Sequence, residues 1–308
     1  MIIVTPKVTP DLDGYACALA YAEFLNKRGE EALGVCSGNP QREVMFLNNE
    51  FNLDVLTYSK DIAKQAARVV LVDASRLQGM PVGFKLEKIS EVIDHRDSPN
   101  VQQLFPNAEI QIEKVGAAAT LIAEKFKNNN IDISRESAIF LYCAIASNTL
   151  NFNAKVTTQR DRDIYDWLGS QTDIPTNLVE RMFKFKSIFD DESFKQTIIG
   201  DFKEIKLGNK LLGLGQLEVV GLDDILKLRK QQILDLLNDL QKDKGTTFIF
   251  LSAVDLVSAK NIFITDHEPT KDLLESVLGI SFNGNDMAEK SGVILRKELI
   301  PEFRKAVS

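Results

Sequence analysis

The chain has 308 residues, 44% of them hydrophobic and 26% charged, with a net charge of −7. This composition is typical of a globular protein of one large or two ordinary domains. The acidic balance argues against a nucleic-acid or anionic-membrane partner, and no apolar run approaches the roughly 20 residues of a membrane-spanning helix.

The first half of the chain alternates strand-like and helix-like segments. Ile2–Thr5 is a short apolar run, and an apolar-periodic helix is expected from Tyr15 to Lys27. Residues 41–49 form an amphipathic region, and further helices are expected at residues 116–127 and 135–148. The strand-like segments that lie between them are EEALGVC, FNLDVLTY, ARVVLVDAS and ISEVIDHRD. Buried runs that end in Asp and are separated by helices predict a parallel sheet with helices on both faces.

The pattern changes near residues 185–195. Beyond this point we expect paired strands in residues 197–220, a long helix from Asp223 to Lys242, and two strands in TTFIFLSAVD and KNIFITDH. The predicted fold is therefore α/β in two domains. Residues 1–187 form the larger domain, residues 188–194 a hinge linker, and residues 195–308 a smaller mixed α/β domain.

Acidic residues stand where three segments of the first half end. Asp11 and Asp13 follow the first strand, Asp73 ends VVLVD, and Asp94 and His95 end SEVIDH. Ligands bind at the carboxyl ends of parallel strands, and carboxylates with one imidazole suit Mn²⁺ or Mg²⁺. Each residue alone has another reading: Asp11 or Asp13 as a helix cap, Asp73 as a turn residue, and His95 as a half-buried histidine.

The order of these motifs points to a family. The first half reads Lys7-Val-Thr-Pro10-Asp11-Leu-Asp13, Asp73, Asp94-His95-Arg96, VGAAATLIAE, Ser147-Asn148-Thr149 and TTQRDRD, and the second half reads Asp201-Phe-Lys203, GLGQLE and Arg296-Lys297 before Pro301. Nearly end to end, this order resembles the two-domain, manganese-dependent family II inorganic pyrophosphatases of the DHH phosphoesterase superfamily.

The resemblance implies a hydrolase of phosphoric anhydrides. Such enzymes hold two divalent ions between their domains, and a water bridging the ions attacks phosphorus. Basic residues of the second domain bind the phosphates. The positions of this chain that match metal ligands are Asp11, Asp13, Asp73 and His95, with Asp94 behind them, and those that match the phosphate-binding residues are Lys203, Arg296 and Lys297. The register of the last pair is open, because counting back from Pro301 places Leu295 at the first basic position.

Three positions depart from the family pattern. Lys7 stands where the family has its first histidine ligand, Asn148 where it has an aspartate ligand, and Arg96 where it has the second histidine of the D-H-H motif. A protonated lysine cannot coordinate a metal, and an asparagine is a neutral, weaker ligand. The first two changes add two positive units, the charge of one divalent ion. We therefore expect the Lys7 ammonium to occupy or neutralise the first metal position. One ion, Mn²⁺ or Mg²⁺, would then sit with Asp13, Asp73 and His95, and with Asn148 as a weak ligand.

Arg96 leaves the function open among three readings. A D-H-R triplet also occurs in the prune-like branch of the superfamily, and an arginine can bind a phosphoryl oxygen with two donors. The first reading is a pyrophosphatase-like hydrolase with Asp73, Asp94, Arg96 and Lys203 in catalytic roles. The second is a prune-like exopolyphosphatase or nucleotide phosphodiesterase. The third is a protein that binds a phosphorylated ligand without turnover.

Cysteine usage and the N-terminus bear on location. Cys17, Cys36 and Cys143 are far apart and odd in number, which argues against a disulfide framework or a structural zinc site. MIIVTPKVTP lacks the basic region of a signal peptide, so we expect a cytoplasmic protein. The resemblance further implies a possible homodimer and a second domain that closes over the first on a small phosphorylated substrate.

Overall fold

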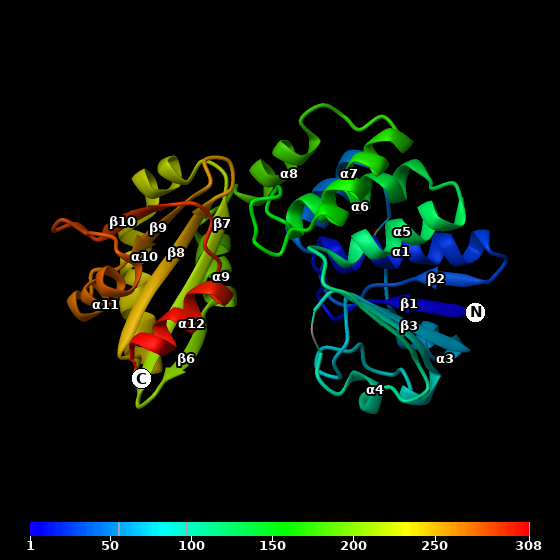
Figure 1. Ribbon diagram of the computed structural model, residues 1–308, viewed down its shortest axis with the longest axis horizontal. Coiled ribbons are helices and arrows are strands. Elements are labelled where there is room, and N and C mark those ends of the chain that lie inside the picture. Colours follow the sequence, from blue (N-terminus) through cyan, green and yellow to red (C-terminus); the bar gives the residue numbers. More distant parts are fainter. Residues whose placement is uncertain (55, 97, 308) are drawn as a thin grey trace. The chain divides into compact units, whose positions relative to one another are not determined.

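The structure is a computed structural model that describes residues 1–54, 56–96 and 98–307. It divides the chain into two compact units, Met1–Phe185 and Lys186–Ser308, and each is described by itself (Figure 1). Within the described residues, no helix has the length and apolar character needed to cross a membrane. All three cysteines are free and buried.

The first unit is built on a parallel sheet. Its strands run in the spatial order β2-β1-β3-β4-β5, and every neighbouring pair is parallel. The bounds of the strands are β1 (Ile2–Thr5), β2 (Ala32–Gly34), β3 (Arg68–Val72), β4 (Ile89–Asp94) and β5 (Glu109–Ile112). The central strands are almost continuously buried and rich in Ile and Val, as strands with covered faces must be.

Helices cover both faces of this sheet. They are α1 (Leu12–Lys27), α2 (Arg42–Phe51), α3 (Lys60–Gln65), α4 (Val101–Leu104), α5 (Ala118–Asn129), α6 (Arg135–Asn148), α7 (Gln159–Gln171) and α8 (Leu178–Lys186), with a 3₁₀ turn at Leu86–Lys88. Figure 1 shows α1, α5, α6 and α7 on one side of the sheet and α3 and α4 on the other. On that second side, Ala66 and Phe105 pack against Val69 and Val92 of the strands.

The second unit has a mixed sheet between two helical layers. Its strands are β6 (Lys203–Leu207), β7 (Lys210–Val219), β8 (Phe248–Asp255), β9 (Lys260–Ile264) and β10 (Met287–Ser291). They lie in the order β10-β9-β8-β7-β6, and only the β7–β8 pair is parallel. The helices are α9 (Asp191–Asp201), α10 (Leu222–Lys244), α11 (Glu268–Leu278) and α12 (Arg296–Ala306).

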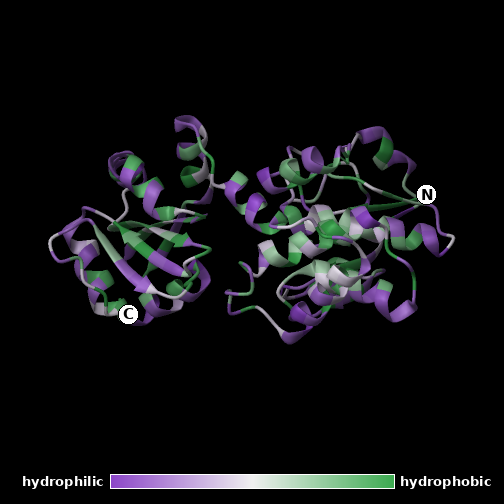
Figure 2. Ribbon diagram, turned by 90° about the horizontal axis from the view of Figure 1, so that it is seen from above, coloured by the Kyte–Doolittle hydropathy of each residue, from purple (hydrophilic) through white to green (hydrophobic). Residues whose placement is uncertain are grey.

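Alternation along β8 explains why this sheet has two cores. Ile249 and Leu251 belong to a cluster with residues of α9 and α10. Phe248 and Phe250 point the other way, into a cluster with residues of α11 and α12. Successive side chains of a strand face opposite sides, so a fully buried strand needs a cover on each side. Figure 2 shows helices that change between hydrophobic and hydrophilic turns, as helices packed on a sheet by one face do.

The two-domain α/β fold is thus confirmed, with three local corrections. FNLDVLTY is not a strand: α2 extends to Phe51, Asn52 follows in a left-handed conformation, and only an isolated bridge joins Cys36 to Thr57; Val55 lies outside the described residues. The start of the predicted paired strands is also wrong, because residues 197–201 complete α9.

The predicted linker differs from the structure as well. The two units divide at Phe185 and Lys186, and residues 191–194 of the predicted linker already belong to α9. Asp190 caps this helix by accepting from the Ser193 amide, and Phe194 is fully buried in the core of the second unit. A segment anchored in this way belongs to the second unit and is not a free linker. The charged residues of this segment had suggested a linker in the sequence.

Candidate metal and phosphate site

Three neighbouring strands of the first unit present the candidate ligands. Asp13 lies in the first turn of α1, just after β1, while Asp73 directly follows β3 and Asp94 ends β4. Because β1, β3 and β4 are adjacent and parallel, their carboxyl ends meet at one edge of the sheet. The backbone at Asp73 is left-handed, with φ of 50°, an uncommon conformation for a residue other than glycine. This geometry turns its carboxylate out of the strand direction.

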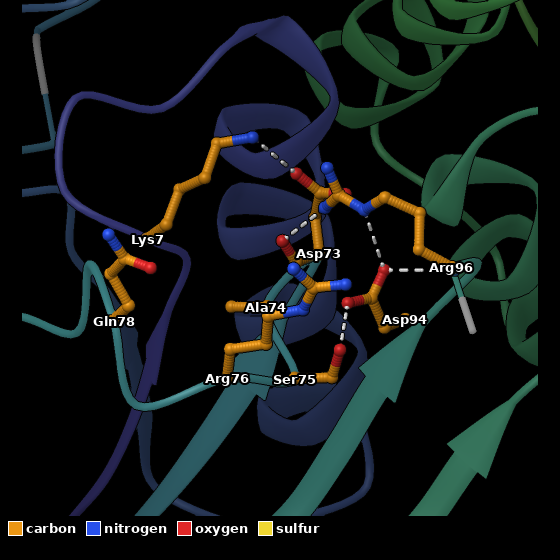
Figure 3. Close-up of a pocket in the computed structure, with 8 residues that line it drawn as sticks. All are labelled: Lys7, Asp73, Ala74, Ser75, Arg76, Gln78, Asp94 and Arg96. Carbon is orange, nitrogen blue, oxygen red and sulfur yellow. Dashed lines mark hydrogen bonds and ion pairs between the residues drawn. The ribbon is translucent and has the colours of Figure 1, made fainter. Parts of the chain in front are cut away.

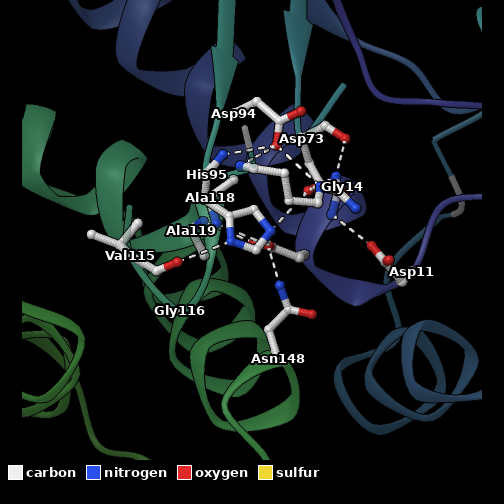
Figure 4. A network of polar contacts seen from close by, with 12 residues as sticks. Asp11, Gly14, Asp73, Asp94, His95, Val115, Gly116, Ala118, Ala119 and Asn148 are labelled. Carbon is white, nitrogen blue, oxygen red and sulfur yellow. Dashed lines mark hydrogen bonds and ion pairs between the residues drawn. The ribbon is translucent and has the colours of Figure 1, made fainter. Parts of the chain in front are cut away.

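Asp13, Asp73 and His95 form a group that can hold a metal ion. Each offers one ligand atom, and these atoms lie within 4.8 Å of one another. His95 Nε2 is 3.8 Å from an Asp13 oxygen and 3.6 Å from Asp73 Oδ1. It is buried and has no hydrogen-bond partner in the described structure, whereas Nδ1 contacts the Val115 carbonyl at 3.0 Å (Figure 4). A proton on Nδ1 leaves Nε2 as a lone-pair donor, so this set fits a divalent cation.

Asp13 is held by the start of α5. Its two carboxylate oxygens accept from the amides of Ala118 and Ala119, each at 2.8 Å. These amides are unpaired donors of the first helical turn, where a negative charge is favoured. The turn that presents them is fixed by Asp161, a buried carboxylate that accepts from the Gly116 amide at 2.9 Å. Asp161 also accepts from the Thr158 hydroxyl and amide at the start of α7.

Asp11 lies outside the three-ligand group. Its Oδ1 accepts from the Gly14 amide at 3.2 Å, which makes it the N-cap of α1. Its other oxygen accepts from the Lys7 ammonium at 2.9 Å, and the same ammonium is 3.4 Å from an Asp73 oxygen. Lys7 thus sits between two carboxylates, as a cation at that position would. The capping role of Asp11 is the alternative that its sequence position had left open.

Arg96 and Asp94 form a second network on the other side of Asp73. The Arg96 guanidinium donates to both a side-chain oxygen and the carbonyl of Asp73, the latter at 2.7 Å, and its Nε donates to Asp94 at 3.2 Å. Asp94 also accepts from the His95 amide at 2.7 Å and from the Ser75 hydroxyl at 2.6 Å. Asp94 therefore orients residues that face the group rather than joining it.

Asn148 reaches the group from the end of α6. Its amide nitrogen donates to Asp13 Oδ2 at 2.6 Å. An aspartate at this position would place two carboxylates against each other, an arrangement that a bound cation stabilises. The asparagine instead gives Asp13 a further hydrogen-bond donor and leaves the negative charge of Asp13 uncompensated.

The pKa values of the three carboxylates shift in different directions. Burial raises the pKa of Asp73 well above its usual range, and the negative charges of Asp11 and Asp13 raise it further, against Arg96 and Lys7. Burial also raises the pKa of Asp13. Burial acts in the same direction on Asp11, but the charge and hydrogen bond of Lys7 outweigh it and lower the pKa of Asp11. The positive charges nearby thus do not offset burial and mutual repulsion at Asp13 and Asp73, so a metal ion would stabilise both carboxylates.

The second unit holds the three predicted phosphate-binding residues. Lys203 is exposed and begins β6, while Arg296 and Lys297 begin α12. The Arg296 guanidinium donates to Asp201, and its backbone amide donates to the Gln216 side chain at 2.6 Å. The motifs Asp201-Phe-Lys203, GLGQ and Arg296-Lys297 therefore meet in space, with Arg296 already paired.

Sequence reasoning missed several residues of the site. Arg76 and Ser75 line a cavity beside Asp73, and Asp161 fixes the turn before α5. Asp161 lies in the quoted TTQRDRD motif, so a cap signal, Thr three residues before an acidic residue, was available. Nothing in the sequence marks the amides of Ala118 and Ala119, because a backbone donor has no side-chain signature.

Comparisons with known proteins place the chain. The N-terminal domain of the DHH family matches residues 1–145, and the DHHA2 domain matches residues 180–306. A protein of Clostridium acetobutylicum named probable manganese-dependent inorganic pyrophosphatase is 26% identical over 100% of this chain and 98% of its own length. A manganese-dependent inorganic pyrophosphatase of Methanothrix thermoacetophila is 24% identical over 99% and 98%.

Solved structures agree on the fold. A Methanococcus jannaschii protein assigned to the family II inorganic pyrophosphatases has a TM-score of 0.68 at 24% identity, covering 100% of this chain and 99% of that one. An exopolyphosphatase-related protein of Bacteroides fragilis has a TM-score of 0.54 at 14% identity, covering 99% and 91%. Two domain matches in order, and relatives aligned over nearly their full lengths, show that this chain carries a DHH-family domain as its first half and a DHHA2 domain as its second half.

Proposed function

We propose that the protein hydrolyses a phosphoric anhydride, pyrophosphate or a short polyphosphate, at a centre that holds one Mn²⁺ or Mg²⁺ ion. The observation that carries the proposal is the buried, unpartnered Nε2 of His95, which faces the carboxylates of Asp13 and Asp73. A polar atom buried without a partner is costly, and a cation removes that cost. The full-length relatives named as manganese-dependent pyrophosphatases support the same substrate class.

One ion is favoured over two by the contacts of Lys7 and Asn148. The Lys7 ammonium lies against Asp11 and Asp73, and the Asn148 amide nitrogen donates to Asp13. Lys7 and Asn148 stand where the family has metal ligands, yet both direct hydrogen-bond donors at these carboxylates, and a donor group cannot coordinate a metal.

The chain's own residues have distinct roles in this proposal. Asp13, Asp73 and His95 hold the ion, which would act as a Lewis acid and make water nucleophilic near neutral pH. Asp94 holds Arg96 and the His95 amide in place, and Arg96 offers donors to a phosphoryl oxygen. Lys203, Arg296 and Lys297 of the DHHA2 unit are proposed to bind the phosphoryl groups, and Arg296 would exchange Asp201 for that ligand.

The test measures phosphate release from pyrophosphate, tripolyphosphate and a dinucleotide with Mn²⁺ or Mg²⁺. The chain has two histidines, which provide a matched pair of variants. We expect His95→Ala to lower the rate at least about 100-fold, since removal of a ligand costs more than the loss of an outer partner. His267→Ala should leave the rate unchanged, because His267 contacts Thr270 in the DHHA2 unit.

The outcomes separate the three readings. Release from pyrophosphate with one tightly bound ion per chain supports the proposal, and two tightly bound ions would contradict its single-ion part. Faster release from tripolyphosphate or the dinucleotide favours a prune-like enzyme. Release no higher than that of Asp73→Ala, with a phosphorylated ligand still bound, favours a binding protein.

A further inference from the structure

A cavity of about 190 Å³ opens beside Asp73 in the DHH unit. It is much larger than the roughly 10–15 Å³ that a single water molecule needs. Figure 3 shows its lining, Lys7, Asp73, Ala74, Ser75, Arg76, Gln78, Asp94 and Arg96. Asp13 and His95 are not part of this lining, so the cavity is a neighbour of the three-ligand group and shares only Asp73 with it.

The lining carries more positive than negative charge. Three cationic side chains, Lys7, Arg76 and Arg96, stand against the two carboxylates of Asp73 and Asp94. This local excess occurs in a chain whose net charge is −7. A concave surface with a positive excess concentrates anions.

Arg76 differs from the other two cations in having no partner. Lys7 contacts Asp11 and Asp73, and Arg96 contacts Asp73 and Asp94. For Arg76, neither an ion pair nor a hydrogen bond of its guanidinium is recorded among the described residues, and Figure 3 draws none within the cavity. Its five N–H donors are therefore available in the planar fork that matches a phosphate or carboxylate.

The loop geometry holds this arrangement in place. Arg76 lies four residues beyond the end of β3, in the loop that continues to Gly79, and the Val8 amide donates to the Gly79 carbonyl at 2.7 Å. The segment that carries Lys7 is thereby tied to the segment that carries Arg76. Ser75 is fixed through its hydroxyl to Asp94 at 2.6 Å. The cavity is thus lined by residues whose backbones are connected to one another.

We propose that this cavity is a phosphate subsite of the DHH unit, in which Arg76 supplies the free donors and Lys7 and Arg96 supply charge. The subsite deepens the proposed function, on which it rests for its place in catalysis: a phosphoryl group here and another at Asp13, Asp73 and His95 describe a ligand with two adjacent phosphates. Phosphate binding itself needs neither turnover nor a metal ion.

The test is a calorimetric titration of the full-length protein with inorganic phosphate and then with pyrophosphate, both in EDTA. We expect Arg76→Gln to weaken binding of both anions about 10-fold or more, as the loss of a charge-assisted contact does. The affinity of Arg76→Lys should lie between those of the wild type and Arg76→Gln, because a lysine keeps the positive charge but loses the planar pair of donors. Arg76 is exposed, so the substitution should not disturb folding, which circular dichroism verifies.

The matched control is Arg68→Gln, at the opposite end of the same strand. Arg68 is also exposed and pairs with Glu30, so its loss changes the net charge equally without touching the cavity. Equal dissociation constants for the wild type, Arg76→Gln and Arg68→Gln would overturn the subsite, as would an absence of binding at millimolar phosphate. Intact phosphate binding without hydrolysis would count against the proposed function alone, and normal KM with Arg76→Gln against the subsite alone.

Discussion

At the scale of single residues, the site is a set of carboxylates whose hydrogen-bond donors come from the chain itself, two of them cationic. Asp73 is contacted by Lys7 and Arg96, and Asp13 by the Asn148 amide. All three partners are departures from the family pattern that the sequence revealed. The lysine stands between the carboxylates of Asp11 and Asp73, and the asparagine directs its amide nitrogen toward Asp13, so the replacement of one ion by these two changes stays a prediction.

This charge balance predicts the effect of restoring the family pattern. Lys7→His with Asn148→Asp removes one positive unit and adds one negative unit at the group. We expect the number of tightly bound Mn²⁺ ions per chain to rise from one to two, measured by equilibrium dialysis and metal analysis.

A control pair makes the same exchange elsewhere in the unit. Lys85 and Asn49 are exposed and are not part of the three-ligand group. Lys85→His with Asn49→Asp should therefore leave the number of tightly bound Mn²⁺ ions at one. Two ions in the wild type, or one ion in the restored variant, would show that Lys7 does not replace a metal.

The sequence identified most of the side chains of the site but not how they share partners. Asp13, Asp73 and His95 were predicted as ligands and lie within 4.8 Å of one another. Asp11 was grouped with them, and the structure uses it as a helix cap paired with Lys7. The sequence does not distinguish Asp11 from Asp13, because the two are separated by a single residue. In the structure, Asp11 caps the start of α1, whereas Asp13 in the first turn of that helix faces Asp73 and His95.

At the scale of elements, the turn before α5 connects three distant parts of the first unit. In this turn Val115 accepts from the ring of His95 and Gly116 donates to Asp161 of α7, and the first two amides of α5, which follow directly, donate to Asp13. The geometry of the ligand group therefore depends on how closely this turn approaches α7 and the end of α6.

Gly116 is the point of closest approach. A Cβ atom there would lie 2.5 Å from Thr149 Cγ2 and 3.0 Å from Asp161 Oδ2. We expect Gly116→Ala to destabilise the protein by about 1–3 kcal/mol, as overpacking does, and to weaken Mn²⁺ binding because Asp13 loses its donors. Denaturant unfolding and a Mn²⁺ titration measure the two effects.

Gly200 in α9 provides the comparison. A Cβ atom there would meet no atom within 4 Å, so Gly200→Ala should stabilise the protein by up to about 1 kcal/mol through helix propensity. If Gly116→Ala proved as stable as Gly200→Ala and bound Mn²⁺ normally, the turn would not position the ligands.

Elements with a strong apolar pattern were predicted well, and short ones were not. The long helix expected over Asp223–Lys242 is α10, Leu222–Lys244, because its repeating leucines face a buried layer. β5 and β10, by contrast, lie at sheet edges and carry polar residues. These two strands form because they pair with a neighbouring strand, and the residue pattern of one segment does not reveal such pairing.

At the scale of the whole molecule, the chain consists of two units with separate cores. The DHH unit is built around a parallel sheet and contains the three-ligand group, while the DHHA2 unit has its own clusters on both faces of a mixed sheet. Two independent cores imply that each unit can be stable alone, and that a metal ion stabilises only the unit that binds it.

This division predicts how the two units respond to metal when they are produced separately. A cut after Lys186, where α8 ends, gives fragments 1–186 and 187–308. Mn²⁺ at 100 times its dissociation constant should stabilise the first fragment by about 2.7 kcal/mol. The second fragment should unfold at the same temperature with or without Mn²⁺, and equal stabilisation of both in thermal scans would contradict the assignment of the metal to the DHH unit.

The contact of the Lys7 ammonium with Asp11 and Asp73 also bears on the supply of metal. Carboxylates that already have counter-ions do not drive one another apart when the metal leaves. We therefore expect chelation to leave Asp11 and Asp73 in place, because Lys7 still pairs with both of them. On this view the fold of the DHH unit outlasts a shortage of manganese, and the site is ready to be reloaded when the metal returns.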